Sequence, residues 1–227
     1  MRYPFVIMDL NGTLVDTFDD LTAALNEVLA AHGRSALDAA HARQGSGEGL
    51  RQLLRAAFQA TGPHLSDPEA GALLLEFRAA YERHLGTRAH LYSGVAATLQ
   101  TLAQNGVKMA VLTNKPEAPS LKLIGQMGIA AWFDYLVAGD GEVARKPDPE
   151  GMDVLLGQLG ARPDQALMVG SSRIDLETAR NARVAIALVD HDPAAPVRGM
   201  GADYVLDHFG KLAALVLGQR PSGVFHI

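Results

Sequence analysis

FVIMDLNGTLVDT, at residues 5–17, is the stretch that decides the fold of this chain. Four apolar residues, Phe5 to Met8, run directly into Asp9, and Gly12 then interrupts the pattern. A short apolar run bounded by turn residues is typical of a buried strand in a parallel sheet. Asp9 is therefore predicted at the carboxyl end of a central strand, where open α/β sheets bind their ligands. A carboxylate there serves as a nucleophile, a metal ligand or both, unless it only caps the following turn.

The remaining patterns divide the chain into an all-helical part and a part in which strands and helices alternate. From residue 16 to residue 88, apolar residues recur at helical spacing without a convincing strand. The strands predicted after this part are residues 107–112, 135–137, 166–169, 184–189 and 204–206. The helices predicted among them are residues 118–128, 149–160, 175–182 and 212–217. Alternating strands and helices predict a parallel sheet that is covered on both faces.

The order of these parts predicts the domain organisation. The all-helical block falls between the first strand and the second, which is the order expected of an insertion. We therefore expect an α/β fold with a three-layer, Rossmann-like parallel-sheet core, formed by residues 1–15 and 89–227. Residues 16–88 are expected to form an inserted helical cap domain.

Two helix starts stand out in the predicted cap. Thr17 and Asp20 have the spacing of a capping box. Ser66 is followed by Pro68 just inside the first turn, which is a strong helix start.

Composition and charge limit the classes of partner. The net charge of −5 argues against nucleic acid and anionic membranes, because no basic surplus exists to neutralise phosphates. The chain contains no cysteine, which excludes disulfides, thiolate metal sites and a cysteine nucleophile. No leader-like segment precedes the first strand, and no run reaches the ~18 apolar residues of a membrane span. We expect a cytoplasmic monomer or homodimer, and we expect its 8 histidines to be surface or capping residues.

Polar residues occur at four places at or just beyond the ends of apolar strands. They are Asp9 with Asn11, Thr113 with Asn114, Lys146, and the turn Gly170-Ser171-Ser172-Arg173-Ile174-Asp175. Because parallel strands end at one edge of the sheet, these residues can converge on an anionic substrate. Taken singly, Lys146 would be a solvated loop lysine, Thr113 a helix cap and Asp175 a helix N-terminal carboxylate.

As a set, these motifs resemble the phosphoglycolate phosphatase-like branch of the haloacid dehalogenase superfamily. The resemblance covers nearly the whole chain, through residues 9–17, 45–50, 113–116, 146–149 and 169–175. It implies a phosphatase acting on a small phosphomonoester similar to 2-phosphoglycolate. It also implies that Asp9 attacks phosphorus and forms an aspartyl-phosphate.

The resemblance implies roles for the other matching residues as well. Besides Asp9, the catalytic group would comprise Asn11, Thr113 and Lys146. The substrate-binding group would comprise Gly12, Thr13, Asn114 and the cap-loop residues Gly45, Ser46 and Gly47. A magnesium ion would be held at Asp9, the main-chain carbonyl of Asn11, Ser171 and Asp175.

Three residues depart from the family pattern. Asn11 replaces the aspartate that serves as general acid and base, a function typically worth ~10²–10⁴-fold in rate. Ser171 replaces a metal-binding aspartate, although magnesium prefers carboxylate oxygens. Arg183 stands where a glycine usually ends a helix. We therefore expect a phosphatase with reduced activity.

Two alternatives stay open at this point. The first is a catalytically impaired or engineered-inactive relative that still binds an anion. The second is a metal-independent, dehalogenase-like hydrolase, since such relatives also lack the second aspartate and carry a serine like Ser171. Against the second alternative, residues 113–116 and 146–149 resemble the phosphatase branch, and position 11 is not the tyrosine usual in dehalogenases.

Overall fold

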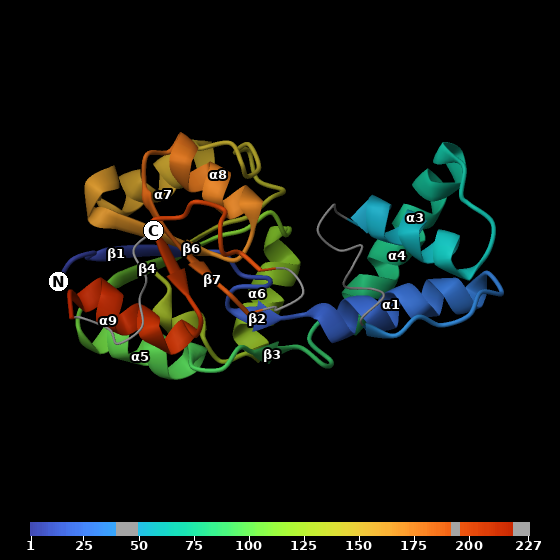
Figure 1. Cartoon of the computed structure of the whole chain (residues 1–227), viewed down its shortest axis with the longest axis horizontal. Helices are drawn as coiled ribbons and strands as arrows, with labels where there is room; N and C mark the ends of the chain where they lie inside the picture. The colour runs from blue at the N-terminus through green and yellow to red at the C-terminus, as the bar shows by residue number, and fades with distance from the viewer. Residues whose placement is uncertain (40–49, 192–195, 220–227) are drawn as a thin grey trace. The chain divides into compact units, whose positions relative to one another are not determined.

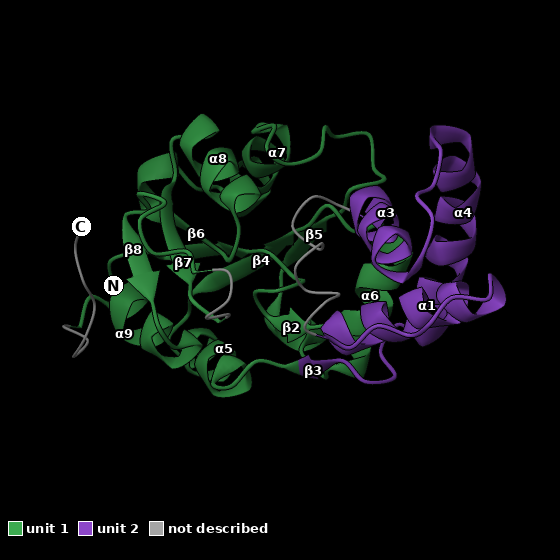
Figure 2. Ribbon diagram, turned by 45° about the vertical axis from the view of Figure 1, so that its right-hand side comes forward, with its two compact units in different colours: residues 1–16, 91–227 green, residues 17–90 purple. Residues whose placement is uncertain are grey.

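The computed structural model describes residues 1–39, 50–191 and 196–219 of the chain. Two compact units are formed, one by residues 1–16 with 91–227 and the other by residues 17–90 (Figure 2). Within the described residues, no helix combines the length and the apolar character needed to cross a membrane.

The first unit is built on a six-stranded sheet whose strand order is β5-β4-β1-β6-β7-β8. The strands are β1 (Phe5–Met8), β4 (Lys108–Leu112), β5 (Tyr135–Val137), β6 (Ala166–Gly170), β7 (Ala185–Val189) and β8 (Tyr204–Leu206). All neighbouring strands run parallel. Met8 lies opposite Val111 of β4 and Val169 of β6, so β1 is central and Asp9 follows it at the middle of the sheet edge.

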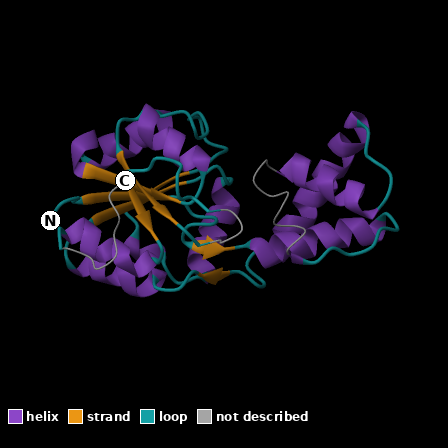
Figure 3. Ribbon diagram, in the orientation of Figure 1, coloured by secondary structure: helices purple, strands orange, loops and turns teal. Residues whose placement is uncertain are grey.

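Helices cover both faces of this sheet (Figures 1 and 3). They are α5 (Val95–Gln104), α6 (Glu117–Gln126), α7 (Glu150–Leu159), α8 (Arg173–Asn181) and α9 (Leu212–Leu217). Short 3-10 turns occupy Ala130–Trp132, Pro163–Gln165 and Phe209–Lys211. Helices α7 and α8 lie on one face, and α5 and α9 lie on the other. The predicted α/β fold with a covered parallel sheet is confirmed.

The central strand is fixed by burial on both of its faces. Ile7 is fully buried in the cluster beneath α7 and α8, with Met152, Leu155 and Leu176. Val6 and Met8, which alternate with Ile7 and so face the opposite side, are also fully buried. Burying each such side chain contributes about 1.5–3 kcal/mol.

The second unit contains α1 (Phe18–Ala31), α3 (Leu50–Thr61) and α4 (Asp67–His84). Their apolar faces share a core that includes Leu25, Leu54, Phe58 and Phe77. The short strands β2 (Val15–Asp16) and β3 (His90–Leu91) pair where the chain passes from one unit to the other.

Several local features differ from the expectations. The helix start at Ser66 is confirmed, because Glu69 accepts a hydrogen bond from Ser66 N at 2.8 Å. The capping box at Thr17 is wrong, because Thr17 makes no side-chain cap bond. Asp20 instead lies fully buried and accepts hydrogen bonds from the main chain of Gly86 and Arg88.

Helix α5 and the two short strands were not expected from the sequence. Helix α5 follows Gly94, whose φ of +84° turns the chain sharply before the apolar repeat begins. Strands β2 and β3 contain 2 residues each, too few to show an alternating pattern.

Candidate active site

The loop after β1 places Asp9 at the sheet edge. Asp9 N donates to Val169 O at 2.9 Å, which continues the pairing of β1 with β6. Gly12 then takes a φ of +80°, and a Cβ added there would lie 3.1 Å from Ser171 Oγ. The positive φ of this turn favours glycine, and a side chain there would also crowd Ser171 Oγ.

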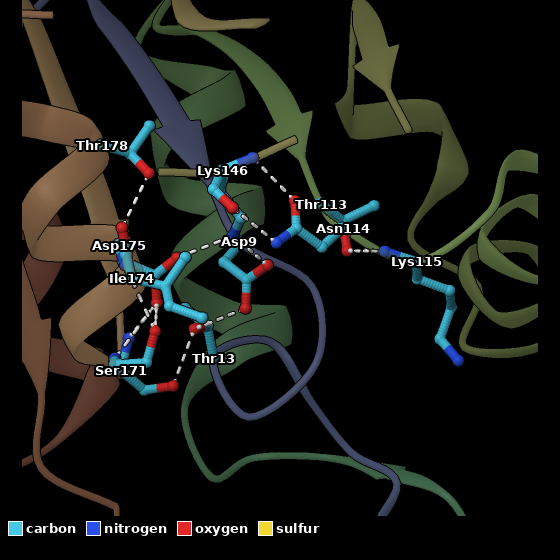
Figure 4. A network of polar contacts seen from close by, with 11 residues as sticks. Asp9, Thr13, Thr113, Asn114, Lys115, Lys146, Ser171, Ile174, Asp175 and Thr178 are labelled. Carbon is cyan, nitrogen blue, oxygen red and sulfur yellow. Dashed lines mark hydrogen bonds and ion pairs between the residues drawn. The ribbon is translucent and has the colours of Figure 1, made fainter. Parts of the chain in front are cut away.

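Lys146 joins two carboxylates in a buried ion-pair network (Figure 4). Its Nζ lies 2.7 Å from Asp9 Oδ1 and 2.7 Å from Asp175 Oδ1. Burial raises the pKa of Asp9 to about 6, although the charge of Lys146 opposes the shift. Burial also disfavours the ammonium, but the charges of Asp175 and Asp9 outweigh it and raise the pKa of Lys146. The network keeps Lys146 charged beside the candidate nucleophile.

Asp175 accepts hydrogen bonds from its own turn and from Lys146. Its Oδ2 accepts hydrogen bonds from Ser171 N at 3.1 Å, Ser172 N at 3.1 Å and Ser172 Oγ at 2.6 Å. Ser172 Oγ in turn accepts from Asp175 N at 3.3 Å, which closes a capping box at the start of α8. A Cβ on Gly170 would come within 2.3 Å of Asp175, so only glycine fits at the end of β6.

Thr13 lies beneath the nucleophile. Its side chain is fully buried, and its Oγ1 donates to Ser171 Oγ at 3.1 Å or to Asp9 Oδ2 at 3.4 Å. The structure thus brings Asp9, Thr13, Ser171, Lys146 and Asp175 together.

Thr113 and Asn114 follow β4 in the same network. Thr113 Oγ1 accepts a hydrogen bond from Lys115 N at 3.2 Å, which leaves the hydroxyl proton available to another acceptor. The Asn114 side chain bonds the main chain of Lys146 at both of its polar atoms. Gly45, Ser46 and Gly47, which were also predicted to bind substrate, lie outside the described residues.

Comparison with known proteins decides the family. Residues 6–189 match the family described as Haloacid dehalogenase-like hydrolase. The chain belongs to the haloacid dehalogenase-like hydrolase family.

Individual relatives of this hydrolase carry phosphatase names. It is 38% identical over 223 residues to a phosphoglycolate phosphatase of Rhodospirillum rubrum, covering 96% of this chain and 92% of the relative. It is 32% identical to an N-acetylmuramic acid 6-phosphate phosphatase of Pseudomonas aeruginosa, with 92% of each chain covered. The crystal structure of a predicted phosphoglycolate phosphatase from Haemophilus somnus is similar, with a TM-score of 0.84 and 26% identity over 96% of this chain and 99% of that one. The resemblance to the phosphoglycolate phosphatase-like branch is confirmed.

Phosphatases of this superfamily generally use Mg²⁺, but the donor set here fits that ion poorly. Asp175 Oδ2 already accepts three hydrogen bonds, and Asp175 Oδ1 and Asp9 Oδ1 each accept one from Lys146. Of the side chains predicted to hold the metal, Asp9 then offers a carboxylate and Ser171 only a neutral hydroxyl. Among the described residues, no group of three or more His, Asp or Glu side chains could hold a metal ion. One readily available carboxylate is a weak basis for an ion that favours carboxylates.

His191 is a residue of this site that the sequence analysis missed. It follows β7, is half-buried, and its Nε2 donates to the main-chain oxygen of Thr13 at 3.0 Å. Its ring stacks on Tyr92 with 3.7 Å between centroids. Burial lowers the pKa of His191, so the neutral Nε2–H form holds the Thr13 loop. The expectation that all histidines are surface or capping residues is wrong for His191. Its position two residues after the end of β7 was the available signal.

Proposed function

We propose that the protein hydrolyses a small phosphomonoester of the 2-phosphoglycolate class through an Asp9 aspartyl-phosphate. One observation carries this proposal: a single ammonium, Lys146 Nζ, lies 2.7 Å from Asp9 at the carboxyl edge of the sheet. The names of the relatives support a phosphatase with a small substrate.

The hydrogen bonds assign the attacking atom. Lys146 Nζ donates to Asp9 Oδ1 at 2.7 Å, whereas the contact of Thr13 Oγ1 with Asp9 Oδ2 is longer, at 3.4 Å. We therefore assign the attack on phosphorus to Oδ2. Lys146 would hold the charge of the phosphoryl group, and the Thr113 hydroxyl, whose oxygen already accepts from Lys115 N, would donate to a phosphoryl oxygen.

Two features of the site oppose fast turnover. Asp9, Asp175 and Lys146 together carry a net charge of −1 when ionised, which repels a dianionic ester. Asn11 can neither protonate the leaving alkoxide nor activate water. We therefore propose slow hydrolysis, in which both the departure of the alkoxide from phosphorus and the attack of water on the aspartyl-phosphate are slowed.

The metal and the helical unit remain parts of this proposal. A magnesium requirement would rest on Asp9 and the phosphate of the substrate, so we propose that any bound ion is held weakly. We propose that residues 17–90 serve as the substrate-selecting cap that the resemblance implies.

The test is phosphate release from 2-phosphoglycolate and a panel of sugar phosphates, with and without Mg²⁺. We expect slow release that the nucleophile variant Asp9→Asn abolishes. If the wild-type protein released phosphate no faster than Asp9→Asn from every ester in the panel, the proposal that it is a phosphatase would be refuted.

A second candidate is metal-independent hydrolysis at carbon, with Asp9 forming a carbon ester. The poor metal donor set around Ser171 favours it, because a monoanionic substrate needs less positive charge than a phosphate dianion. Halide release from 2-chloropropionate, without phosphate release from any ester, would establish this candidate over the first.

A further inference from the structure

Asn114 holds the main chain of Lys146 at both of its hydrogen-bonding groups. Asn114 Oδ1 accepts from Lys146 N at 2.8 Å, and Asn114 Nδ2 donates to Lys146 O at 3.0 Å (Figure 4). Both distances are those of well-formed hydrogen bonds. Two bonds from one rigid amide fix the orientation of the Lys146 backbone as well as its position.

Asn114 is itself anchored to the sheet. Thr113 N donates to Val137 O at 3.0 Å, which continues the pairing of β4 with β5 past the end of the strands. Gly139 N donates to Lys115 O at 2.9 Å, and a Cβ on Gly139 would lie only 2.2 Å from Asn114 O. The main chain on either side of Asn114 is therefore held by hydrogen bonds to neighbouring main chain.

Lys146 requires such an anchor because it does not come from a strand or a helix. It lies between the end of β5 at Val137 and the start of α7 at Glu150. Segments of this kind are more mobile than the elements they connect, and a lysine side chain adds its own rotamer freedom. Yet Lys146 Nζ contacts two carboxylates at 2.7 Å.

We propose that Asn114 is a positioning residue that sets the Lys146 ammonium between Asp9 and Asp175, and not a ligand of the substrate. The inference deepens the proposed function, because Lys146 is the cation that would bind the phosphoryl group there. Misplacing a catalytic group by about 1 Å can cost about 10²-fold in rate. Asn114 acts on the substrate only through Lys146.

Crystal structures of Asn114→Leu and Asn114→Asp test the inference without any activity. The leucine has a similar size but makes neither bond, and the aspartate keeps only the bond to Lys146 N. In Asn114→Leu we expect Lys146 Nζ to leave its 2.7 Å contact with Asp9. In Asn114→Asp we expect at least the direction of that contact to change. An unchanged ammonium position in both variants would overturn the inference.

A double-mutant cycle on the affinity for inorganic phosphate separates positioning from direct binding. We expect Asn114→Leu to weaken phosphate binding by about 10-fold or more, and to cause no further loss when Lys146→Met is already present. A direct ligand would give additive losses, which would refute the inference. If the wild-type protein neither binds inorganic phosphate nor releases phosphate from any ester, the proposed function fails. The crystal structures of the two Asn114 variants would still decide the role of Asn114.

Asn181→Ala provides the matched control. Asn181 is exposed, and its Nδ2 donates to Pro147 O at 2.9 Å, one residue beyond Lys146. The substitution Asn181→Ala thus removes a hydrogen bond from an asparagine side chain to a main-chain carbonyl of the same segment, and it leaves the hydrogen bonds of Lys146 intact. We expect phosphate affinity to change by less than about threefold. A loss as large as that of Asn114→Leu would show a general effect on the segment, and would count against a specific role for Asn114.

Discussion

Lys146 Nζ lies 2.7 Å from Asp9 Oδ1, although 137 positions separate the two residues in the chain. The side chains of Lys146 and Asp9 are only 4% and 11% exposed, so the pair is shielded from water. The same ammonium neutralises Asp175. Removing it would leave two buried carboxylates without a cation.

Lys146→Met is therefore expected to lower the free energy of unfolding by about 3–5 kcal/mol, the usual cost of an uncompensated buried charge. Chemical denaturation measures this change. Lys108→Met is the control, because Lys108 pairs with Asp134 at 3.0 Å on the surface and should cost less than about 1 kcal/mol. Equal costs for the two variants would show that the buried network adds no stability.

The raised pKa of Asp9 predicts how activity depends on pH. Burial raises this pKa to about 6, against the opposing charge of Lys146. The nucleophile must be ionised, so kcat/KM should fall about tenfold per pH unit below about pH 6 and stay level above it.

The control for this pH profile is needed because a phosphomonoester has its own ionisation near pH 6. A carbon-13 titration of the Asp9 carboxyl without substrate removes that ambiguity. A midpoint near pH 4 in that titration would contradict the prediction.

The sequence predicts the inner strands of the sheet well because β1 and β6 are almost wholly buried on both faces. Phe5 to Met8 and Ala166 to Val169 are continuous apolar runs, which are typical of strands buried on both faces of a parallel sheet. The edge to which Asp9 is presented follows from the same pattern. Helix α5 was missed although Val95, Leu99 and Leu102 are buried at helical spacing.

The contacts within the site could not be predicted in the same way. Spacing places Asn114 after a strand, but it does not say that both polar atoms of the side chain turn to Lys146. His191 likewise contacts Thr13 across 178 positions of sequence. Side-chain direction over such separations depends on tertiary packing, which a single sequence does not display.

Arg183 predicts a stabilising substitution. Arg183 lies just beyond α8 and has a φ of 57°. Among the described residues, it alone combines a left-handed backbone with a side chain larger than that of glycine. That conformation costs a non-glycine residue about 1–2 kcal/mol, so Arg183→Gly should raise the free energy of unfolding by about 1 kcal/mol.

The comparison for Arg183→Gly is Arg78→Gly, at an exposed position inside α4. There glycine should lower the free energy of unfolding by about 1 kcal/mol. Thermal or chemical denaturation distinguishes the two signs. Destabilisation by both substitutions would mean that the arginine side chain at 183 contributes more than its backbone strain costs.

Asn11→Asp tests whether the missing acid and base limits turnover. An ionisable carboxyl at position 11 could protonate the leaving alkoxide and activate water, so kcat for phosphate release should rise by about 10²-fold or more. Asn105→Asp adds the same charge at the end of α5, on the surface, and should leave kcat unchanged. If kcat does not respond to Asn11→Asp, the slow step lies elsewhere.

Ser171→Asp tests whether the poor donor set limits magnesium binding. In the wild-type protein, Ser171 Oγ accepts a hydrogen bond from Thr13 and supplies no charge beside Asp9 Oδ2. A second carboxylate there should tighten Mg²⁺ binding by about tenfold or more, because each added charge interacts strongly with a divalent ion in a partly buried site. Calorimetric titration with Mg²⁺ measures this effect without any substrate. Ser171→Asn, which adds a neutral side chain of the same shape, should not tighten binding. Wild-type protein that already binds Mg²⁺ as tightly as Ser171→Asp would refute the conclusion that the present donors fit the ion poorly.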